Sequence, residues 1–370
     1  MAFPILSFFT GGGFFDLGFK KAGFTICWTN ENCPAFVKGY GYGMSAWLTS
    51  LNTKRAMRAA ISNTSSICDL EAKKVLKEAF DGPRPDVFGV IGGPPCPDFS
   101  TGGTHAGGNG INGKLTTTFV DMICGIKPPF FVIENVPGLY RVHKHREFLE
   151  KKMSQLRAAG YMVDFKILNA LEFGVPQHRE RLFVIGFKRP LAKNAVGRKL
   201  EPGESGWFSW PEIEAYKGVK LLPWPKVSPF GKTPDKPKEI PLALTAYSAL
   251  SENGDPEKIA NGNEYFKSYS SKFKEIQEGD VSRMSFKRLH RFRFSPTAWY
   301  GNQEVHLHPW KPRRLSVRET LRLQSVPDEY VLPEDMTLSA KFKMICNGVP
   351  YVLSFYLAKA LERFLKRAIQ

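Results

Sequence analysis

The chain has few of the residues that build metal centres or disulfide frameworks. Its 370 residues include only six cysteines and seven histidines, and no two cysteines form a C-x-x-C pair. The two H-x-H pairs, at His143 and His145 and at His306 and His308, have no cysteine beside them. Zinc sites usually combine such residues at short spacing, so we expect neither a bound metal ion nor structural disulfides.

Long apolar runs are also missing. No stretch reaches the length of a membrane span, and the start, "MAFPILSFF", lacks the basic residues and the longer apolar segment of a signal peptide. Hydrophobic residues make up 42% of the chain and charged residues 24%, as in ordinary soluble proteins. We therefore expect a cytoplasmic protein without membrane contact, large enough for one main core and a second, smaller unit.

Acidic residues are fewer than basic ones. Asp and Glu number 35 against 52 Lys and Arg, which gives a net charge of +17. A basic surface favours polyanions, because phosphate contacts release condensed counterions. Nine basic residues gather among aromatic ones in a basic stripe, at positions 283, 287, 288, 291, 293, 311, 313, 314 and 318. The stripe predicts a nucleic-acid surface, with Arg291 and Arg293 as candidate contacts.

The first half of the chain alternates β-branched or aromatic runs with helical stretches. We expect strands at 4–9, 24–30, 86–91, 130–134 and 181–187. We expect helices at 14–22, 115–126 and 146–159. This rhythm predicts an α/β fold with a doubly wound, mostly parallel sheet covered by helices on both faces. Its ligand is expected at the carboxyl ends of the strands.

The pattern changes after Lys188. "KRPLAKNAVGRKLEPGESG" has no clear period, and 223–241 holds six prolines, which exclude long helices and central strands there. We expect three parts: a first domain over 1–189, an irregular domain over 190–300, and a return segment over 301–370. The end of the chain, 351–370, has an apolar face and is predicted to be a helix that packs on the first domain.

A third glycine is missing from the turn "SFFTGGGFFDLGF" (7–19). Gly11 and Gly13 are followed by two phenylalanines and Asp16, so the dinucleotide fingerprint fails and a nicotinamide dehydrogenase is disfavoured. The turn instead favours a ligand with an adenosine but no pyrophosphate, because glycines let the backbone approach it closely.

Three side chains near this turn are candidates to hold such a ligand. Phe9 offers an aromatic face, and Glu31 stands twenty residues past Gly11, where a carboxylate can accept both ribose hydroxyls. Asp69 follows "SSIC" and could take the adenine amino group. Each acid alone could equally be a solvated surface residue, and it is their order along successive strands that favours a site.

Two further stretches place reactive groups beside turns. "GGPPCPDFS" (92–100) fixes Cys96 between prolines and is followed by glycine-rich residues, which suits a rigid nucleophile next to a mobile loop or, alternatively, a buried structural thiol. "FFVIENVPG" (130–138) brings Glu134 out of an apolar strand, where desolvation raises a carboxyl pKa and favours a proton donor. A capping role is the alternative for Glu134.

Three polar side chains alternate along "VPQHRERLFVIGF" (175–187). Gln177, Arg179 and Arg181 therefore lie on one face of an extended strand. Arginines at a protein surface are common, but two guanidinium groups entering an apolar strand indicate a shared anionic or carbonyl-bearing ligand.

Taken in order, these strings resemble the cytosine-5 DNA methyltransferases over nearly the whole chain outside 190–295. The matching strings are "FFTGGGFFDLGF", "TNE", "GGPPCPDFS", "IENVPG", "QHRERLFVIGF", "RRLSVRETLRLQSVPDEY" and "NGVPYVLSFYLAKAL". The resemblance implies the Rossmann-like fold of methyltransferases that use S-adenosylmethionine, with 190–300 as the target-recognition domain. It also implies a double-stranded DNA partner, a monomer associated with the nucleoid, and a restriction-modification setting with a partner endonuclease.

The resemblance also assigns roles to residues. Cys96 matches the nucleophile that adds to carbon 6 of a flipped cytosine, Glu134 the carboxyl at N3, and Arg179 and Arg181 the pair around the cytosine carbonyl and the catalytic loop. Ser100 and Gln177 match DNA-contacting positions, Ser100 within the loop that closes on DNA. The residues that match cofactor-binding positions are Phe9, Gly11, Gly13, Glu31, Asp69, Pro94 and Asn347.

The chain departs from the family pattern at four positions. Ser7 stands where the family usually has Asp, Phe14 where a glycine is usual, Pro97 where Gln is common, and Cys346 where a glycine precedes Asn347. Two alternatives remain open at this point. One is a tRNA cytosine-5 methyltransferase of the same fold, and the other is a non-catalytic regulator that only binds DNA.

Overall fold

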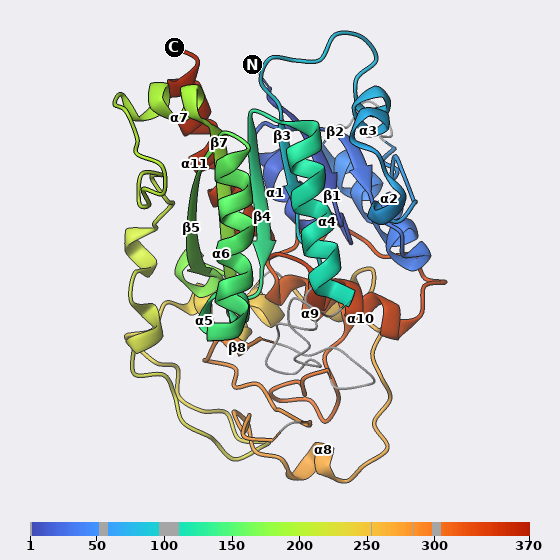
Figure 1. The fold of residues 1–370 in the computed structure, drawn as a ribbon. Helices are drawn as coiled ribbons and strands as arrows, with labels where there is room; N and C mark the ends of the chain where they lie inside the picture. Colours follow the sequence, from blue (N-terminus) through green and yellow to red (C-terminus); the bar gives the residue numbers. More distant parts are fainter. Residues whose placement is uncertain (1, 52–57, 96–110, 253, 284, 298–304) are drawn as a thin grey trace.

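A computed structural model gives the fold of the chain (Figure 1). It describes residues 2–51, 58–95, 111–252, 254–283, 285–297 and 305–370. Helices surround a central sheet in the upper part of the view, and irregular chain fills the lower part.

Among the described residues, six strands form the central sheet, in the order β2-β1-β3-β4-β7-β5. The strands are β1 (Pro4–Phe8), β2 (Thr25–Asn30), β3 (Gly89–Gly92), β4 (Phe130–Asn135), β5 (Tyr161–Asn169) and β7 (Glu180–Lys188). β2, β1, β3 and β4 are parallel, whereas β7 runs antiparallel to both of its neighbours. The mostly parallel sheet predicted from the sequence is confirmed.

Both faces of the sheet are buried, as alternation along β4 shows. Phe130 and Val132 belong to one core, and Phe131 and Ile133 belong to the other. The helices of the first core are α1 (Phe14–Lys21), α7 (Arg189–Val196) and α11 (Tyr351–Ala368). The helices of the second are α3 (Ala72–Ala79), α4 (Ile111–Ile126) and α6 (His143–Ala158). This arrangement explains why the strands read as continuous apolar runs.

A third core lies beside the glycine turn. It joins α2 (Pro34–Leu51), α9 (Val317–Leu323) and α10 (Leu338–Asn347) through side chains such as Tyr40 and Tyr330. Ala246, Leu250 and Leu289 come from the predicted recognition segment and pack into the same core. Part of the 190–300 segment is therefore packed against α2, α9 and α10.

The rest of 190–300 has little regular structure, as its prolines predict. Its beginning lies against the main layer, where the Phe208 and Phe364 rings are 5.3 Å apart. β8 (Ser295–Pro296) pairs with β6 (Gln177–His178), beside the arginine motif. The other short elements are η5 (Glu214–Tyr216), η6 (Val219–Leu221), η7 (Leu242–Leu244), η8 (Ser248–Glu252), η9 (Pro256–Lys258) and α8 (Lys272–Glu275). The three-part division of the chain stays a prediction.

The predicted strands and helices of the first domain match the structure closely, but α2, α3, α5 (Gly138–Arg141), β5 and α7 were not predicted. The stretch after Lys188, which has no clear period in the sequence, forms the helix α7. α7 begins there with Pro190 in its first turn and ends at Gly197, whose φ of 76° suits a glycine C-cap. The predicted C-terminal helix is confirmed as α11, and it packs on α1 within the first core.

By length and composition alone, the helical stretch Leu338–Ala368 could cross a membrane. It consists of α10 and α11, separated by Gly348, Val349 and Pro350. Most of its apolar side chains pack inside the protein, so its composition reflects core packing.

The carboxyl ends of β1 to β4 face the irregular part of the chain (Figure 1). Four segments reach this edge: the glycine turn after β1, Glu31 after β2, Gly93 and Pro94 after β3, and Glu134 at the end of β4. The site must therefore be sought where the two parts meet.

Candidate active site

The glycine turn and Glu31 are joined directly. Glu31 Oε2 accepts a hydrogen bond from the backbone N–H of Gly11 at 2.9 Å, and Oε1 accepts one from that of Cys33 at 2.8 Å. The carboxylate is 8% exposed, and each oxygen keeps a lone pair for another donor. Gly11 and Glu31, both predicted to line one ligand site, are thus in direct contact in the structure.

Aromatic and sulfur-containing side chains support the turn from inside. Gly13 starts α1 with φ at 74°, and a Cβ there would lie 2.6 Å from the Tyr40 ring. Tyr330 donates its hydroxyl hydrogen to the Gly12 carbonyl at 2.7 Å, and Met344 packs against the same glycine. These supporting residues were not predicted, because they come from distant segments of the chain.

The other predicted cofactor residues differ in their exposure. Phe9 is held at a φ of 52°, which is strained for an aromatic residue, and its ring meets Phe119 edge-on at 5.6 Å. Asp69 is exposed in η1 (Ile67–Asp69), and Asn347 is exposed at the end of α10. The chain just before η1 lies beside β2, since Asn30 Nδ2 donates to the Ser65 carbonyl at 2.9 Å.

A nearly buried ion pair stands at the ends of β4 and β7. Arg181 Nε lies 2.8 Å from Glu134 Oε1, with the two side chains 11% and 10% exposed. Burial raises the pKa of the Glu134 carboxyl, and the nearby guanidinium groups of Arg181 and Arg179 counteract part of that rise. The pair brings together two of the predicted catalytic residues.

The end of β3 leaves room for this pair. A Cβ at Gly93 would lie only 2.6 Å from Glu134 Oε2, so no other residue fits there without moving the carboxylate. Pro94, the next residue, is buried. Cys96 and Ser100, which follow it, lie outside the described residues, so their predicted roles rest on the sequence.

Arg179 acts within the protein interior. Its side chain is 0% exposed, and Nη2 donates to the carbonyls of Cys346 and Gly348, the latter at 2.9 Å. These carbonyls flank Asn347, so Arg179 connects the arginine motif to the end of α10. Arg181 forms a hydrogen-bonded ion pair with Glu134, and the charge of Arg179 also acts on that carboxyl.

Gln177 is a buried amide without a described partner. It is 0% exposed, and neither Oε1 nor Nε2 makes a hydrogen bond. It pairs through its backbone with Ser295 of β8, where the first domain meets the recognition segment. Burying an unpaired amide is costly, so this side chain requires a partner beyond the described residues.

Much of the basic stripe serves internal contacts. Arg291 is 8% exposed and forms a bidentate ion pair with buried Glu278. Its Nε donates to Glu278 Oε1 at 2.9 Å and its Nη2 to Oε2 at 2.8 Å. Arg288 is 0% exposed and donates to backbone carbonyls, including that of Ile276 at 2.8 Å. Phosphate contact by these two side chains would require those bonds to break. Arg293 is half-buried, and no side-chain hydrogen bond is recorded for it among the described residues.

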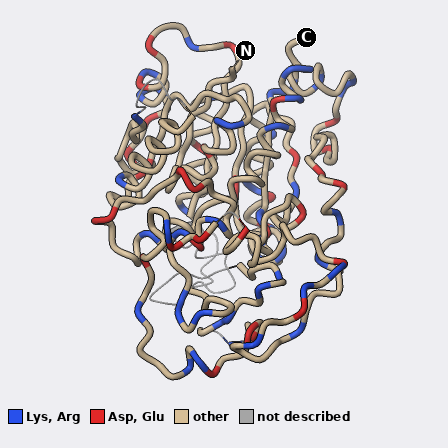
Figure 2. The backbone as a smooth tube through the Cα atoms, turned by 180° about the vertical axis from the view of Figure 1, so that it is seen from behind, with Lys and Arg blue, Asp and Glu red and all other residues tan. Residues whose placement is uncertain are grey.

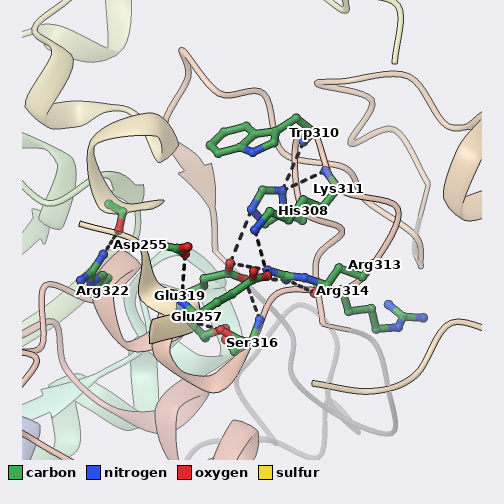
Figure 3. Close-up of polar contacts among 12 residues, drawn as sticks. Asp255, Glu257, His308, Trp310, Lys311, Arg313, Arg314, Ser316, Glu319 and Arg322 are labelled. Carbon is green, nitrogen blue, oxygen red and sulfur yellow. Dashed lines mark hydrogen bonds and ion pairs between the residues drawn. The ribbon is translucent and has the colours of Figure 1, made fainter. Parts of the chain in front are cut away.

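Figure 3 shows a second internal network at the start of α9. Glu319 accepts two hydrogen bonds from Arg313, at 2.7 and 2.8 Å, and lies 3.5 Å from His308. Ser316 and Glu319 form the capping box of the helix. Arg313 also reaches Glu257, so the network ties the recognition segment to the catalytic part.

The exposed positive charge comes mainly from residues that the stripe did not include. Figure 2 shows basic residues along the irregular part of the chain. Those that are exposed within 190–300 are Lys193, Arg198, Lys199, Lys217, Lys220, Lys226, Lys232, Lys236, Lys238, Lys258, Lys267, Lys272, Lys274 and Arg283. Of these, only Arg283 belongs to the predicted stripe.

Comparison with known proteins identifies the family. The profile of the C-5 cytosine-specific DNA methylase family matches residues 3–363. The chain belongs to this family. It is a DNA cytosine-5 methyltransferase of the type II restriction-modification kind, and its methyl donor is S-adenosylmethionine.

Relatives match this methyltransferase along its full length. It is 40% identical over 98% of its chain to the type II methyltransferase M.NmeDI of Neisseria meningitidis serogroup C, covering 84% of that protein. It is 28% identical to M.MthTI of Methanothermobacter thermautotrophicus, with 99% of each chain covered. These relatives argue against a nicotinamide dehydrogenase.

Solved structures support the fold. A structure described as a prophage-encoded DNA modification methyltransferase of E. coli gives a TM-score of 0.67 at 21% identity, covering 99% of this chain and 100% of that one. The S. pombe Dnmt2 methyltransferase gives 0.58 at 15% identity, covering 97% and 98%. The Rossmann-like methyltransferase fold predicted from the sequence is confirmed.

Gly93→Ala tests whether the space beside Glu134 matters. The added Cβ would displace the carboxylate, and a shift of about 1 Å in a catalytic group can cost about 10²-fold in rate. We expect such a loss of methyl transfer, measured with tritiated S-adenosylmethionine and plasmid DNA. Gly41→Ala is the control, because its Cβ would meet only the Ala59 carbonyl, at 3.4 Å. Equal activities would contradict the role of this contact.

Proposed function

We propose that the enzyme methylates carbon 5 of a cytosine flipped out of duplex DNA, through a transient bond between Cys96 and carbon 6. The observation that supports it most is the nearly buried Glu134–Arg181 pair at the strand ends, which lies beside Gly93, three residues before Cys96 in the chain. A polar, enclosed pair of this kind can bind the edge of a pyrimidine. Inside stacked DNA that edge is paired, so the base must leave the helix to reach the pair.

The first chemical step follows from the poor nucleophilicity of cytosine. Carbon 5 becomes nucleophilic once a thiolate has added to carbon 6, which turns the ring into an enamine. Glu134 would donate a proton or a strong hydrogen bond to N3 while charge builds there. Its raised pKa, caused mainly by burial, favours the acid form needed for that donation.

The two arginines would play different parts. Arg181, beside Glu134, is placed to donate to the cytosine carbonyl oxygen while keeping the carboxyl in position. Arg179 would act as a positioning residue, since it holds the carbonyls on either side of Asn347. Gln177, buried and unpaired at the junction with β8, would contact the DNA.

The cofactor site would lie over the glycine turn. Glu31 is placed to bind the ribose hydroxyls, Phe9 to stack on the adenine, and Asp69 to reach the adenine amino group. Gly11, Gly13, Pro94 and Asn347 would complete the walls. When bound, S-adenosylmethionine supplies an electrophilic methyl group to the activated carbon 5. The contact between Gly11 and Glu31 supports this arrangement.

The DNA would lie between the catalytic part and the irregular segment. Exposed lysines along 217–274 and the half-buried Arg293 would contact phosphates, and Ser100 would approach the DNA from the loop after Cys96. We further propose a cytoplasmic, nucleoid-associated monomer that works beside a restriction endonuclease with the same target site.

A comparison of methyl acceptors tests the proposed reaction. We expect the enzyme to methylate duplex plasmid DNA and not tRNA, and bisulfite sequencing should place the methyl groups at cytosines in one short motif. Glu134→Gln should lower turnover by about 10² to 10⁴-fold, because the amide cannot give a proton to N3. Methylation of tRNA alone would contradict the proposal, as would full activity of the Glu134→Gln variant.

The salt dependence of DNA binding tests Arg293. If its guanidinium touches a phosphate, Arg293→Met should reduce the slope of log affinity against log salt by about 1. Arg363→Met is the control, because Arg363 is exposed near the end of α11, and that end lies at the opposite end of the view from β8 and α8 (Figure 1). Filter binding between 50 and 300 mM salt measures both. Equal slopes for the two variants would remove Arg293 from the proposed interface.

A further inference from the structure

A buried carboxyl group lies directly behind the glycine turn. Asp16 is in the first turn of α1 and is 0% exposed. Its two described hydrogen bonds come from hydroxyl groups, and no ion pair to it is found among the residues that the structure describes. A buried acid is normally paired with a cation. The described residues give the Asp16 carboxyl two hydroxyl donors but no ion-pair partner.

Hydroxyl groups connect this carboxyl to the turn. Ser7, near the end of β1, donates its hydroxyl hydrogen to Asp16 Oδ1 at 2.7 Å, and Tyr40 on α2 donates to Oδ2 at 3.4 Å. Thr10 Oγ1 donates to the Ser7 carbonyl at 3.2 Å and lies 3.4 Å from Ser7 Oγ. Thr10 leads into Gly11, so the chain of contacts runs from the buried acid to the proposed ligand surface.

The surroundings of Asp16 leave it close to ionisation at neutral pH. Burial raises its pKa to about 7, while the Ser7 and Tyr40 hydroxyls and, least, the charge of Lys20 oppose the rise. Tyr40 and Tyr330 are the other titratable groups that face it, and both have pKa values raised by burial, so they stay neutral. A nearby cation would therefore shift Asp16 to its ionised form.

We propose that ionised Asp16 balances the positive charge of S-adenosylmethionine bound over the Gly11–Gly13 turn, so that binding releases the Asp16 proton to solvent. The inference rests on the proposed cofactor site and adds a residue to it. S-adenosylmethionine carries a sulfonium, whereas the product S-adenosylhomocysteine carries a neutral thioether in its place. A buried carboxylate would favour the donor over the product, and so help exchange one for the other after each turnover.

The direction of the pH dependence follows from linkage. Below pH 6 Asp16 is mostly protonated, so the cationic donor must bind next to a neutral acid or expel its proton. Above pH 8 the carboxylate is already charged and the donor binds without that cost. If binding lowers the pKa of Asp16 from about 7 to about 6, affinity should rise about fivefold between pH 6 and pH 8. The neutral thioether should show a much smaller change.

Isothermal titration calorimetry with both ligands tests the proposal. We expect the dissociation constant of S-adenosylmethionine to fall about fivefold from pH 6 to pH 8, with a binding heat that depends on the buffer because a proton is released. Asp16→Asn should abolish this dependence and bring the affinity for the donor at pH 8 down to its pH 6 value, while leaving S-adenosylhomocysteine binding nearly unchanged. Asp81→Asn, at an exposed acid, should behave as wild type.

The outcomes separate the inference from its premise. An unchanged ratio of donor to product affinity in Asp16→Asn at pH 8 would overturn the role of Asp16, because a structural role would weaken both ligands equally. Failure of the wild type to bind either ligand would overturn the proposed cofactor site itself.

If Asp16→Asn does not fold, Ser7→Ala offers a second test. Removing the 2.7 Å hydrogen bond to the carboxylate should raise the pKa of Asp16 and move the midpoint of the pH dependence upward. An unmoved midpoint would contradict the inference.

Discussion

The ion pair between Glu134 and Arg181 is the constraint on which the site depends. It joins β4 to its antiparallel neighbour β7 at the edge where the parallel strands end. Enclosing two charges costs solvation free energy, and a hydrophobic pair of similar size could stabilise the fold as well or better. The pair also requires a glycine at position 93 and a nearly dry environment. Binding of a polar edge, such as that of cytosine, would explain why a charged pair is kept here despite its solvation cost.

The irregular segment is ordered by buried arginines more than by a large core of its own. Arg288 binds backbone carbonyls, Arg291 pairs with Glu278, and Arg313 joins Glu319 to Glu257. Each supplies several donors in fixed directions, which suits chain without regular hydrogen bonding. The basic residues that remain exposed are mostly lysines, which carry charge without such internal bonds. Basic charge therefore serves two purposes in one segment.

The sequence predicted what depends on local pattern. Strand runs, the glycine turn, and the placement of Glu31 and Glu134 at strand ends follow from periodicity and from the rule for parallel sheets. α2 was missed because its glycines reduce helix propensity, yet Gly43 lets the Tyr330 ring approach and Gly39 does the same for Met344. The roles of Arg179, Arg291 and Asp16 depend on partners distant in sequence or on burial, which no local pattern contains.

The most direct test of the account is covalent trapping at Cys96. A duplex that includes the motif found by bisulfite sequencing, with 5-fluorocytosine in place of every cytosine of one strand, contains the target, and fluorine blocks release of the thiol after methyl transfer. With S-adenosylmethionine present, the account predicts a denaturant-resistant complex whose cross-linked peptide contains Cys96, and no complex for Cys96→Ser. Absence of any adduct from an enzyme that methylates ordinary DNA, or attachment at another residue, would contradict it.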